Sequence, residues 1–153
     1  AVQIPVLAAG GIATGAGMLA AMVLGADGVQ CGSRFAAATE SSVHDNFKQC
    51  IVDTQEGETQ VTLKELAPVR LIKNKFYEDV QQLYEKCPTK EELAKLLGRA
   101  RAKQGMFEGN LVEGELEIGQ IAGLIDKILP AADIVHEMMT EFKSAIEEQK
   151  HYL

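Results

Sequence analysis

Two short segments that contain glycine carry the residue types that suit the binding of a phosphate group. They are formed by Gly10, Gly11, Gln30, Cys31, Gly32 and Ser33. Glycine lets the backbone turn tightly or lie close to a ligand, and loops after parallel strands can aim several backbone N–H groups at one point. One such turn alone is a weak signal, because glycines also serve tight turns and close packing. Two turns in succession favour a phosphate site.

The segments around these turns predict a strand, a helix and a second strand. Residues 6–9 form a short apolar run without alternation, as expected of a parallel strand that is covered on both faces. Thr14 is placed to cap the helix that follows, and Gly25 stands where a helix C-terminal glycine belongs. Residues 27–31 then supply the second strand.

Several longer stretches resemble a known family. IPVLAAGGIATG and LGADGVQCGSRF resemble the last two barrel strands of the flavin-dependent nitronate monooxygenase and enoyl-ACP reductase II superfamily. Further similarity follows in SSVHDNFK at 41–48, PVRLIKNKF at 68–76 and EGELEIGQIAGLI at 113–125, and these blocks resemble bacterial enoyl-ACP reductase II in particular. The resemblance implies an α/β fold, namely the C-terminal part of an FMN-binding (β/α)8 TIM barrel followed by a mainly helical extension. The barrel strands would lie in residues 1–40, and residues 41–153 would pack on the barrel.

The length of the chain limits this comparison. A complete barrel of this kind needs about 250 residues, and the chain has 153. We therefore expect a C-terminal portion of a longer protein, whose partner is a missing N-terminal barrel segment of roughly six strands. Without such neighbours, residues 6–9 would present an apolar sheet edge that invites association.

The resemblance also implies a cofactor and a reaction. FMN would be the cofactor, NADH or NADPH the reductant, and an enoyl thioester on acyl carrier protein the substrate. Gly10 and Gly11 would donate backbone N–H groups to the FMN phosphate, and residues 30–33 would form the second half of the cradle. The Ser33 hydroxyl would be an extra donor, whereas Cys31 would contribute its backbone only.

No residue of this chain is assigned a catalytic or metal-binding role. The histidines are His44, His136 and His151. The family's catalytic histidine lies upstream of the position of Ala1, so none of them corresponds to it. His44 precedes an expected helix, where capping or surface exposure is the simpler role. The three cysteines are widely spaced and odd in number, so neither a zinc site nor a disulfide framework is indicated.

Basic residues in the C-terminal region are candidates for contacts with a ligand or a partner. Arg70 and Lys73 could meet a phosphorylated substrate arm, a nicotinamide dinucleotide or an acidic carrier protein. Alternatively, Arg70 could pair with a carboxylate and fix the extension to the barrel. Lys95, Arg99 and Arg101 make their segment basic, and a solvated face is the ordinary role of such charges. A docking patch for acyl carrier protein is the alternative.

Other local signals predict elements between residues 57 and 153. The alternation at residues 61–63 predicts an extended segment, and the capping box at residues 89–92 predicts the start of a helix. The glycines between residues 105 and 114 indicate a flexible connection. Residues 119–123 open a short helix whose small residues allow close approach to another helix or to a flavin ring. The last helix begins near Asp133, and its apolar face could close the barrel or serve a homodimer.

Composition excludes some partners. The net charge of −7 and the pI near 5.0 argue against nucleic acid. No run approaches the ~20 apolar residues of a membrane helix, and no signal peptide is visible. We expect a cytoplasmic protein with no membrane partner.

Two other functions stay open. The first is a nitronate monooxygenase, which oxidises small alkyl nitronates with oxygen on the same scaffold. The second is a non-catalytic interaction fragment, or a flavin-free barrel that binds a sugar phosphate with the same turns. Tightly bound FMN would separate the two enzymes from these last alternatives.

Overall fold

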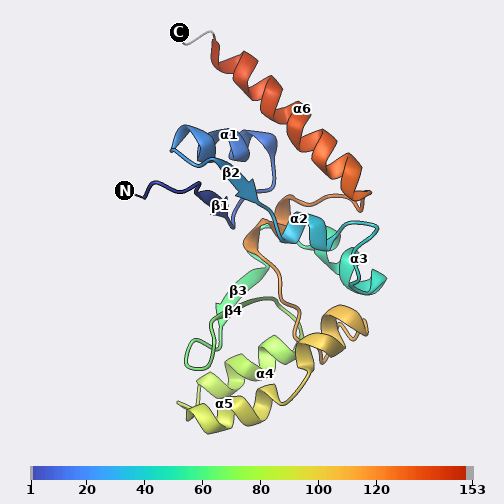
Figure 1. Cartoon of the computed structure of the whole chain (residues 1–153). Helices are drawn as coiled ribbons and strands as arrows, with labels where there is room; N and C mark the ends of the chain where they lie inside the picture. Colours follow the sequence, from blue (N-terminus) through green and yellow to red (C-terminus); the bar gives the residue numbers. More distant parts are fainter. Residues whose placement is uncertain (1, 151–153) are drawn as a thin grey trace.

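A parallel pair of strands opens the structure, a computed structural model that describes residues 2–150 (Figure 1). Strand β1 is Leu7–Ala9, helix α1 is Gly15–Val23 and strand β2 is Gly28–Gln30. Leu7 lies opposite Gly28 and Ala9 opposite Gln30, so the two strands run in the same direction and α1 is the crossover between them. The predicted strand–helix–strand unit is confirmed, with strands slightly shorter than residues 6–9 and 27–31.

Both ends of α1 follow from local residues. The side-chain oxygen of Thr14 accepts a hydrogen bond from the backbone N–H of Gly17 at 3.1 Å, which satisfies a donor that the first helical turn leaves free. Gly25 follows the C-cap residue Leu24 and has a φ of +103°, a conformation that glycine adopts without strain. The two predicted ends of this helix are confirmed.

Residues 6–9 lie largely exposed in the described chain, as expected of a strand whose neighbouring strands are missing. Val6 is 44% exposed and Leu7 is 59% exposed. Among the described strands, β1 pairs only with β2, so the apolar side chains at its other edge have no neighbouring strand to cover them. An apolar run favours a buried strand, but burial depends on segments beyond the run itself.

Helix α6, Ala131–Gln149, packs along α1 (Figure 1). Ile134 and Met138 of α6 are buried in this part of the core. Gly15 of α1 has no room for a side chain, because a Cβ there would collide with the backbone of Met138 and Phe142. This close approach lets the carboxylate of Glu141 accept a hydrogen bond from the Gly15 backbone N–H at 2.7 Å.

Three short helices connect the part formed by β1, β2, α1 and α6 to the rest of the chain. Helix α2 is Ser33–Ala36, helix α3 is Asp45–Asp53 and the 3-10 helix η2 is Gln120–Leu124. His44 is the N-cap of α3, since its Nδ1 accepts a hydrogen bond from the backbone N–H of Asn46 at 3.1 Å. The capping role expected for His44 is confirmed. Phe47 and Ile51 of α3 are buried in a core cluster that includes Ile121 of η2.

A β-hairpin and two helices form the other end of the molecule (Figure 1). Strand β3 is Thr59–Thr62, strand β4 is Val69–Ile72, helix α4 is Lys75–Tyr84 and helix α5 is Lys90–Leu97. The strands are antiparallel, with Thr59 opposite Ile72. The extended segment predicted at residues 61–63 lies in β3 as far as Thr62, whereas β4 was not predicted.

The two helices pack on the hairpin through a second core cluster. Phe76 and Val80 of α4 and Leu93 of α5 are buried there. The predicted capping box begins α5: the Thr89 side chain accepts a hydrogen bond from the Glu92 backbone N–H, and the Glu92 carboxylate accepts one from the Thr89 backbone N–H. That prediction is confirmed.

The glycine-containing segment between residues 105 and 114 is tightly packed, so the expectation of a flexible connection is wrong. Gly105 is buried within a short π-helix, η1, at Lys103–Phe107. A Cβ on Gly105 would lie 2.8 Å from the carbonyl oxygen of Glu115, and a Cβ on Gly114 would collide with the backbone of Gly105. These glycines therefore serve close packing between two backbone segments.

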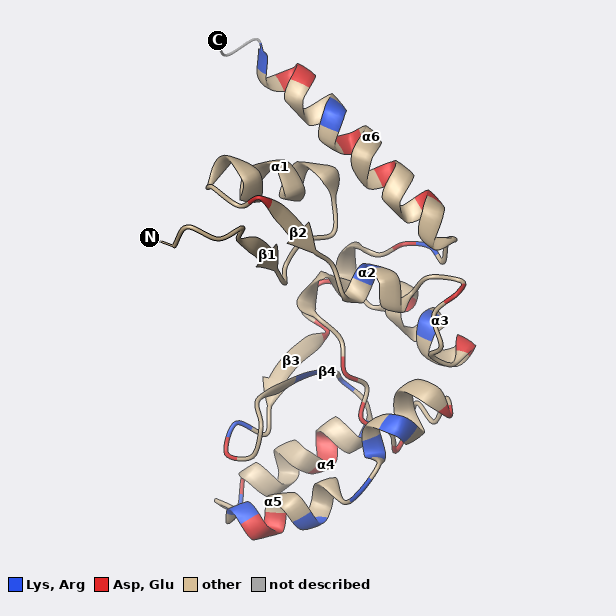
Figure 2. Ribbon diagram, in the orientation of Figure 1, with Lys and Arg blue, Asp and Glu red and all other residues tan. Residues whose placement is uncertain are grey.

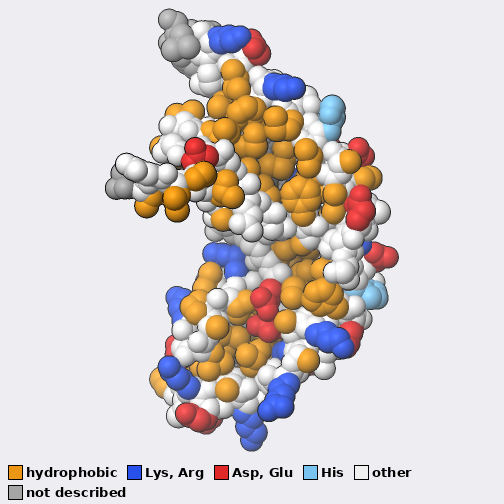
Figure 3. Space-filling view, in the orientation of Figure 1, with side chains coloured by type: hydrophobic (Ala, Val, Ile, Leu, Met, Phe, Trp, Pro, Cys, Tyr) orange, Lys and Arg blue, Asp and Glu red, His pale blue; other side chains and the backbone are white. Residues whose placement is uncertain are grey.

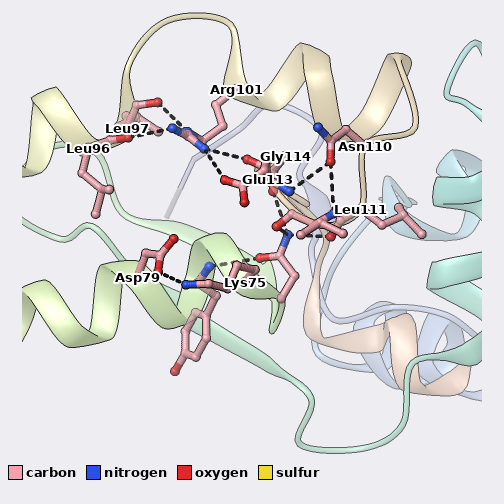
Figure 4. A network of polar contacts seen from close by, with 12 residues as sticks. Lys75, Asp79, Leu96, Leu97, Arg101, Asn110, Leu111, Glu113 and Gly114 are labelled. Carbon is pink, nitrogen blue, oxygen red and sulfur yellow. Dashed lines mark hydrogen bonds and ion pairs between the residues drawn. The ribbon is translucent and has the colours of Figure 1, made fainter.

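Arg101 is held by the protein, so the expectation of a solvated charge is wrong for this residue. Its guanidinium donates hydrogen bonds to the carbonyl oxygens of Leu97 at 2.8 Å, Leu96 at 3.0 Å and Glu113 at 2.7 Å (Figure 4). It also lies over the ring of Phe76, 4.5 Å from the centroid, in a cation–π contact. Arg101 joins the end of α5 to α4 and to the segment after η1.

Candidate phosphate and flavin site

The six residues predicted to hold a phosphate line one cavity of about 280 Å³. They are Gly10, Gly11, Gln30, Cys31, Gly32 and Ser33, and the remaining wall comes from Ala9, Ile12, Gly119 and Ile121. The cavity lies at the carboxyl ends of β1 and β2, because each of the two turns follows directly after one of these strands. The structure thus brings together residues that lie about 20 positions apart in the sequence.

Among the three glycines of the predicted phosphate site, Gly10 and Gly11 are required by their backbone conformation. Gly10 has a φ of +84° and Gly11 a φ of +74°, values at which other residues are strained. Gly32 has a φ of −92°, which any residue adopts. A Cβ at any of the three would meet nothing within 4 Å, so all three leave open space where a ligand would lie against the backbone. A ligand could therefore approach the backbone closely at all three positions.

The side chains that line this cavity are uncharged. None of its described lining residues carries a charged side chain, so backbone N–H groups and the Ser33 hydroxyl are the groups that can receive an anion. Desolvation by burial raises the pKa of the Cys31 thiol above its ordinary value, which keeps it protonated at neutral pH. A protonated thiol is a weak nucleophile, in line with a backbone contribution from Cys31.

Ser33 and Gly119 connect the second turn to the segment before η2. The Gly119 backbone N–H donates a hydrogen bond to the Ser33 Oγ at 3.0 Å. A Cβ on Gly119 would lie 2.7 Å from that oxygen, so glycine is needed for the contact. The sequence predicted that small residues here approach another helix or a flavin, and in the described chain Gly119 approaches the first residue of α2. The Ser33 hydroxyl hydrogen is still available to a ligand.

Two larger cavities adjoin the first one. A cavity of about 510 Å³ shares Gly11 and Ile121 with it, and a cavity of about 560 Å³ shares Gly32, Ser33 and Gly119 with it. Shared walls make these cavities parts of one cleft between the strand pair and the hairpin, and Figure 3 shows the molecule hollowed between its two ends. The cleft is large enough for a ligand that extends beyond the phosphate.

Arg70 of β4 lines both of the larger cavities. Its Nη1 donates hydrogen bonds to the carbonyl oxygen and to the Oγ1 of Thr59, each at 3.1 Å. The alternative that Arg70 pairs with a carboxylate is wrong, because no ion pair of the described residues includes it. Lys73 lies outside the cleft lining, and its Nζ donates to the carbonyl oxygen of Gly57 at 2.9 Å.

Helix α6 anchors the segments that follow both turns, and sequence reasoning missed this. Arg34, which is buried, comes directly after Ser33 and forms an ion pair with the partly exposed Glu137 of α6 at 2.7 Å. Gly15, four residues after Gly11, donates to Glu141 one helical turn further along α6. The sequence feature that could have indicated this anchoring is Arg34 itself, an arginine directly after the second turn. Its partner lies 103 positions away.

The parallel strand pair with its crossover helix is an α/β arrangement, and the turns at the carboxyl ends of both strands line one uncharged cavity. The family model for nitronate monooxygenase matches residues 1–141. The chain therefore belongs to the nitronate monooxygenase family, whose members are FMN-dependent oxidoreductases.

Named relatives agree with this assignment. The chain is 35% identical over 125 residues to a probable nitronate monooxygenase of Staphylococcus saprophyticus, covering 81% of this chain and 35% of that protein. It is 30% identical to a nitronate monooxygenase of Paraburkholderia phytofirmans, covering 98% of this chain and 41% of that protein. The chain thus spans less than half the length of these relatives.

Solved structures give the same picture. The structure of FabK from Thermotoga maritima superposes with a TM-score of 0.90 at 38% identity, covering 99% of this chain and 48% of that one. A nitroalkane oxidase from Streptomyces ansochromogenes superposes with a TM-score of 0.73 at 29% identity, covering 96% of this chain and 42% of that one. None of the described helices is long and apolar enough to cross a membrane.

Proposed function

We propose that this chain forms the C-terminal part of an FMN-dependent enoyl-ACP reductase. The observation that carries the proposal is the single uncharged cavity in which Gly10, Gly11 and residues 30–33 meet. In this proposal β1 and β2 are the last two strands of a (β/α)8 barrel, and a further barrel segment covers the open edge of β1. Barrels of this kind commonly hold a phosphate in the loops after the seventh and eighth strands.

The residues of this chain would hold the phosphate end of FMN. Gly10, Gly11 and Gly32 line the cavity, where their backbone N–H groups would donate to the phosphate. The Ser33 hydroxyl would add a donor whose oxygen already accepts a hydrogen bond from the Gly119 N–H. Ile12 and Ile121 form apolar walls that would shield these hydrogen bonds from water and so strengthen them. When bound, FMN supplies hydride transfer between NADH or NADPH and the enoyl thioester.

The reductase is favoured over the monooxygenase by the closeness of the structural match. The TM-score is 0.90 with FabK, which is an enoyl-ACP reductase II, and 0.73 with the nitroalkane oxidase. A nitronate monooxygenase is the second candidate, supported by the family model and by the curated relatives. The two differ in the oxidant that accepts the hydride or electrons, and the residues of the phosphate cradle would serve both.

A visible absorption spectrum of the protein that contains this chain tests the proposal. We expect a flavin spectrum that bleaches on addition of NADH or NADPH and recovers when a crotonyl thioester is added without oxygen. Oxygen consumption with an alkyl nitronate, and no recovery with the thioester, would favour the monooxygenase. A protein that cannot be reconstituted with FMN would overturn both and leave a flavin-free phosphate site or an interaction role.

A further inference from the structure

Arg70 is the one cationic residue in the walls of the cleft. Among the described residues that line the three adjoining cavities, it alone carries a positive charge. It lines the two larger cavities but not the cavity formed by the two turns after β1 and β2. The positive charge of the cleft therefore lies apart from the proposed FMN phosphate cradle.

This arginine is partly removed from water without a carboxylate partner. Arg70 is half-buried, and arginines withdrawn from water are normally paired with an anion. Glu56 and Glu117 stand in the walls of the same cavities, yet neither forms an ion pair with it within the described part of the chain. Within the described residues, the Arg70 guanidinium therefore binds neutral oxygens of Thr59 and forms no ion pair.

The guanidinium is also held in a fixed position. Its Nη1 binds two oxygens of Thr59 on the neighbouring strand, and the Arg70 carbonyl oxygen accepts a hydrogen bond from the Ile118 backbone N–H at 3.1 Å. These contacts place Arg70 between β3 and the segment that leads to Gly119. A guanidinium held at one nitrogen keeps its other N–H groups for a planar, bidentate contact with phosphate.

We propose that Arg70 binds a phosphate group of the second ligand that enters the cleft beside the flavin. The proposal rests on the proposed function for the identity of that ligand. The phosphate belongs either to the pantetheine arm of the thioester substrate or to the nicotinamide dinucleotide. Both ligands bring phosphate groups on flexible arms into a cleft whose cavities of about 510 and 560 Å³ meet at Arg70.

Calorimetric titration with two matched ligand pairs tests the proposal without turnover. 4′-Phosphopantetheine is compared with pantetheine, and nicotinamide mononucleotide with nicotinamide riboside, on the wild-type protein, Arg70→Gln and Lys73→Gln. Lys73→Gln is the matched control, since it removes a neighbouring positive charge that lies outside the cleft lining. We expect one phosphate-bearing ligand to bind the wild type at least tenfold more tightly than its phosphate-free counterpart. Arg70→Gln should abolish that advantage, and Lys73→Gln should keep it.

The two sources of phosphate give different results. Loss of the 4′-phosphopantetheine advantage in Arg70→Gln assigns Arg70 to the thioester arm, and loss of the nicotinamide mononucleotide advantage assigns it to the dinucleotide. No advantage in the wild type, or an advantage that survives in Arg70→Gln, would overturn the proposal. Failure of the proposed function is seen separately, as a protein whose flavin spectrum is absent or does not bleach.

Discussion

Gly11 and Gly32 of the candidate phosphate cavity differ in what a methyl group would do at each position. At Gly11 a side chain would meet open space but would be strained, because φ is +74°. At Gly32 a side chain would meet open space without strain, because φ is −92°. Backbone strain and loss of ligand space can therefore be separated by substituting the two glycines one at a time.

We expect Gly11→Ala to lower both stability and FMN affinity, and Gly32→Ala to lower FMN affinity alone. A left-handed alanine costs about 1–2 kcal/mol, whereas a methyl group at Gly32 only fills the cradle. Urea unfolding measures the first effect, and quenching of flavin fluorescence measures the second. Riboflavin, which lacks the phosphate, is the control ligand. Wild-type FMN affinity in Gly32→Ala would contradict a phosphate at this turn.

Glu115 is a buried carboxyl group near η1 whose titration opposes folding at high pH. It is 7% exposed, and desolvation by burial raises its pKa to about 7, with a further rise from Glu117 and a smaller opposing effect of Arg101. The unfolded chain releases this proton near the ordinary pKa of a glutamate. Between those two values the folded state holds more protons, so the free energy of unfolding falls as pH rises.

We expect the free energy of unfolding to fall by roughly 2 kcal/mol more in the wild type than in Glu115→Gln between pH 5 and pH 8. The glutamine keeps the shape of the side chain but does not titrate. Urea denaturation at a series of pH values gives both curves, and their difference cancels the other titrating groups. Glu91→Gln, an exposed substitution on α5, should follow the wild type. Parallel curves for wild type and Glu115→Gln would show that Glu115 ionises freely.

At the scale of elements, α6 sets where the two turns lie relative to each other. Glu137 binds Arg34 at the start of α2 and also pairs with Lys127. Glu141, one turn later, binds the first N–H of α1. Because α1 follows the first turn and α2 follows the second, one rigid helix fixes both halves of the cradle.

We expect Glu137→Ala to weaken FMN binding more than riboflavin binding and to lower stability by about 3 kcal/mol, because it leaves Arg34 buried without its counter-charge. Glu141→Ala should have the same selective effect with a loss of about 1 kcal/mol. Glu147→Ala is the control, since it removes an exposed pair with Lys150 on the same helix. The measurements are urea unfolding and the ratio of FMN to riboflavin affinity. An unchanged ratio would limit α6 to a general structural role.

The elements that sequence reasoning predicted are those specified by adjacent residues. Thr14, Gly25 and Thr89 act within a few positions of themselves, so their helix ends were predicted and are confirmed. Strand β4 was missed because four residues with a central arginine give little pattern. Its extended conformation depends on pairing with β3 and on a bridge from Leu71 to Glu117.

The cradle residues were predictable in type, and their anchoring was not. Glycines after apolar runs indicate turns from the local sequence alone. The contact between Gly15 and Glu141, in contrast, joins residues 126 positions apart. The same limit explains Arg101, whose charge suggested solvent exposure until its partners across α4 and the segment after η1 were known. Contacts between distant segments carry no local signal.

At the scale of the whole molecule, the apolar surface is concentrated over α1, α6 and β1. Figure 3 shows hydrophobic side chains gathered over α1 and α6. Val135 of α6 is 51% exposed and Met139 is 39% exposed, and both lie on the same helical stripe as Ile146. Exposed apolar patches of this kind mark interaction surfaces. The open edge of β1 and this stripe are the surfaces that a further barrel segment, or a second copy, would cover.

The opposite end of the molecule carries a basic surface on an acidic chain. We define it by Lys90 and Lys95 of α5 and by Arg99, all exposed. Figure 2 shows positive residues on α5 and the segment after it, although the net charge of the chain is −7. Arg101 does not belong to this surface, because its guanidinium is bound by backbone carbonyls. A surface of this charge suits an acidic carrier protein.

We expect the double variant Lys95→Glu/Arg99→Glu to lower kcat/KM for an enoyl thioester on acyl carrier protein about tenfold. The same variant should use the N-acetylcysteamine thioester as the wild type does, because that substrate has no carrier to dock. Lys143→Glu/Lys150→Glu, which reverses two exposed charges on α6 and at its C-terminal end, is the matched control. Added salt should raise the KM of the wild type for the carrier-linked substrate and change the variant less. Equal kinetics of the two double variants on the carrier-linked substrate would assign these charges to solvation alone.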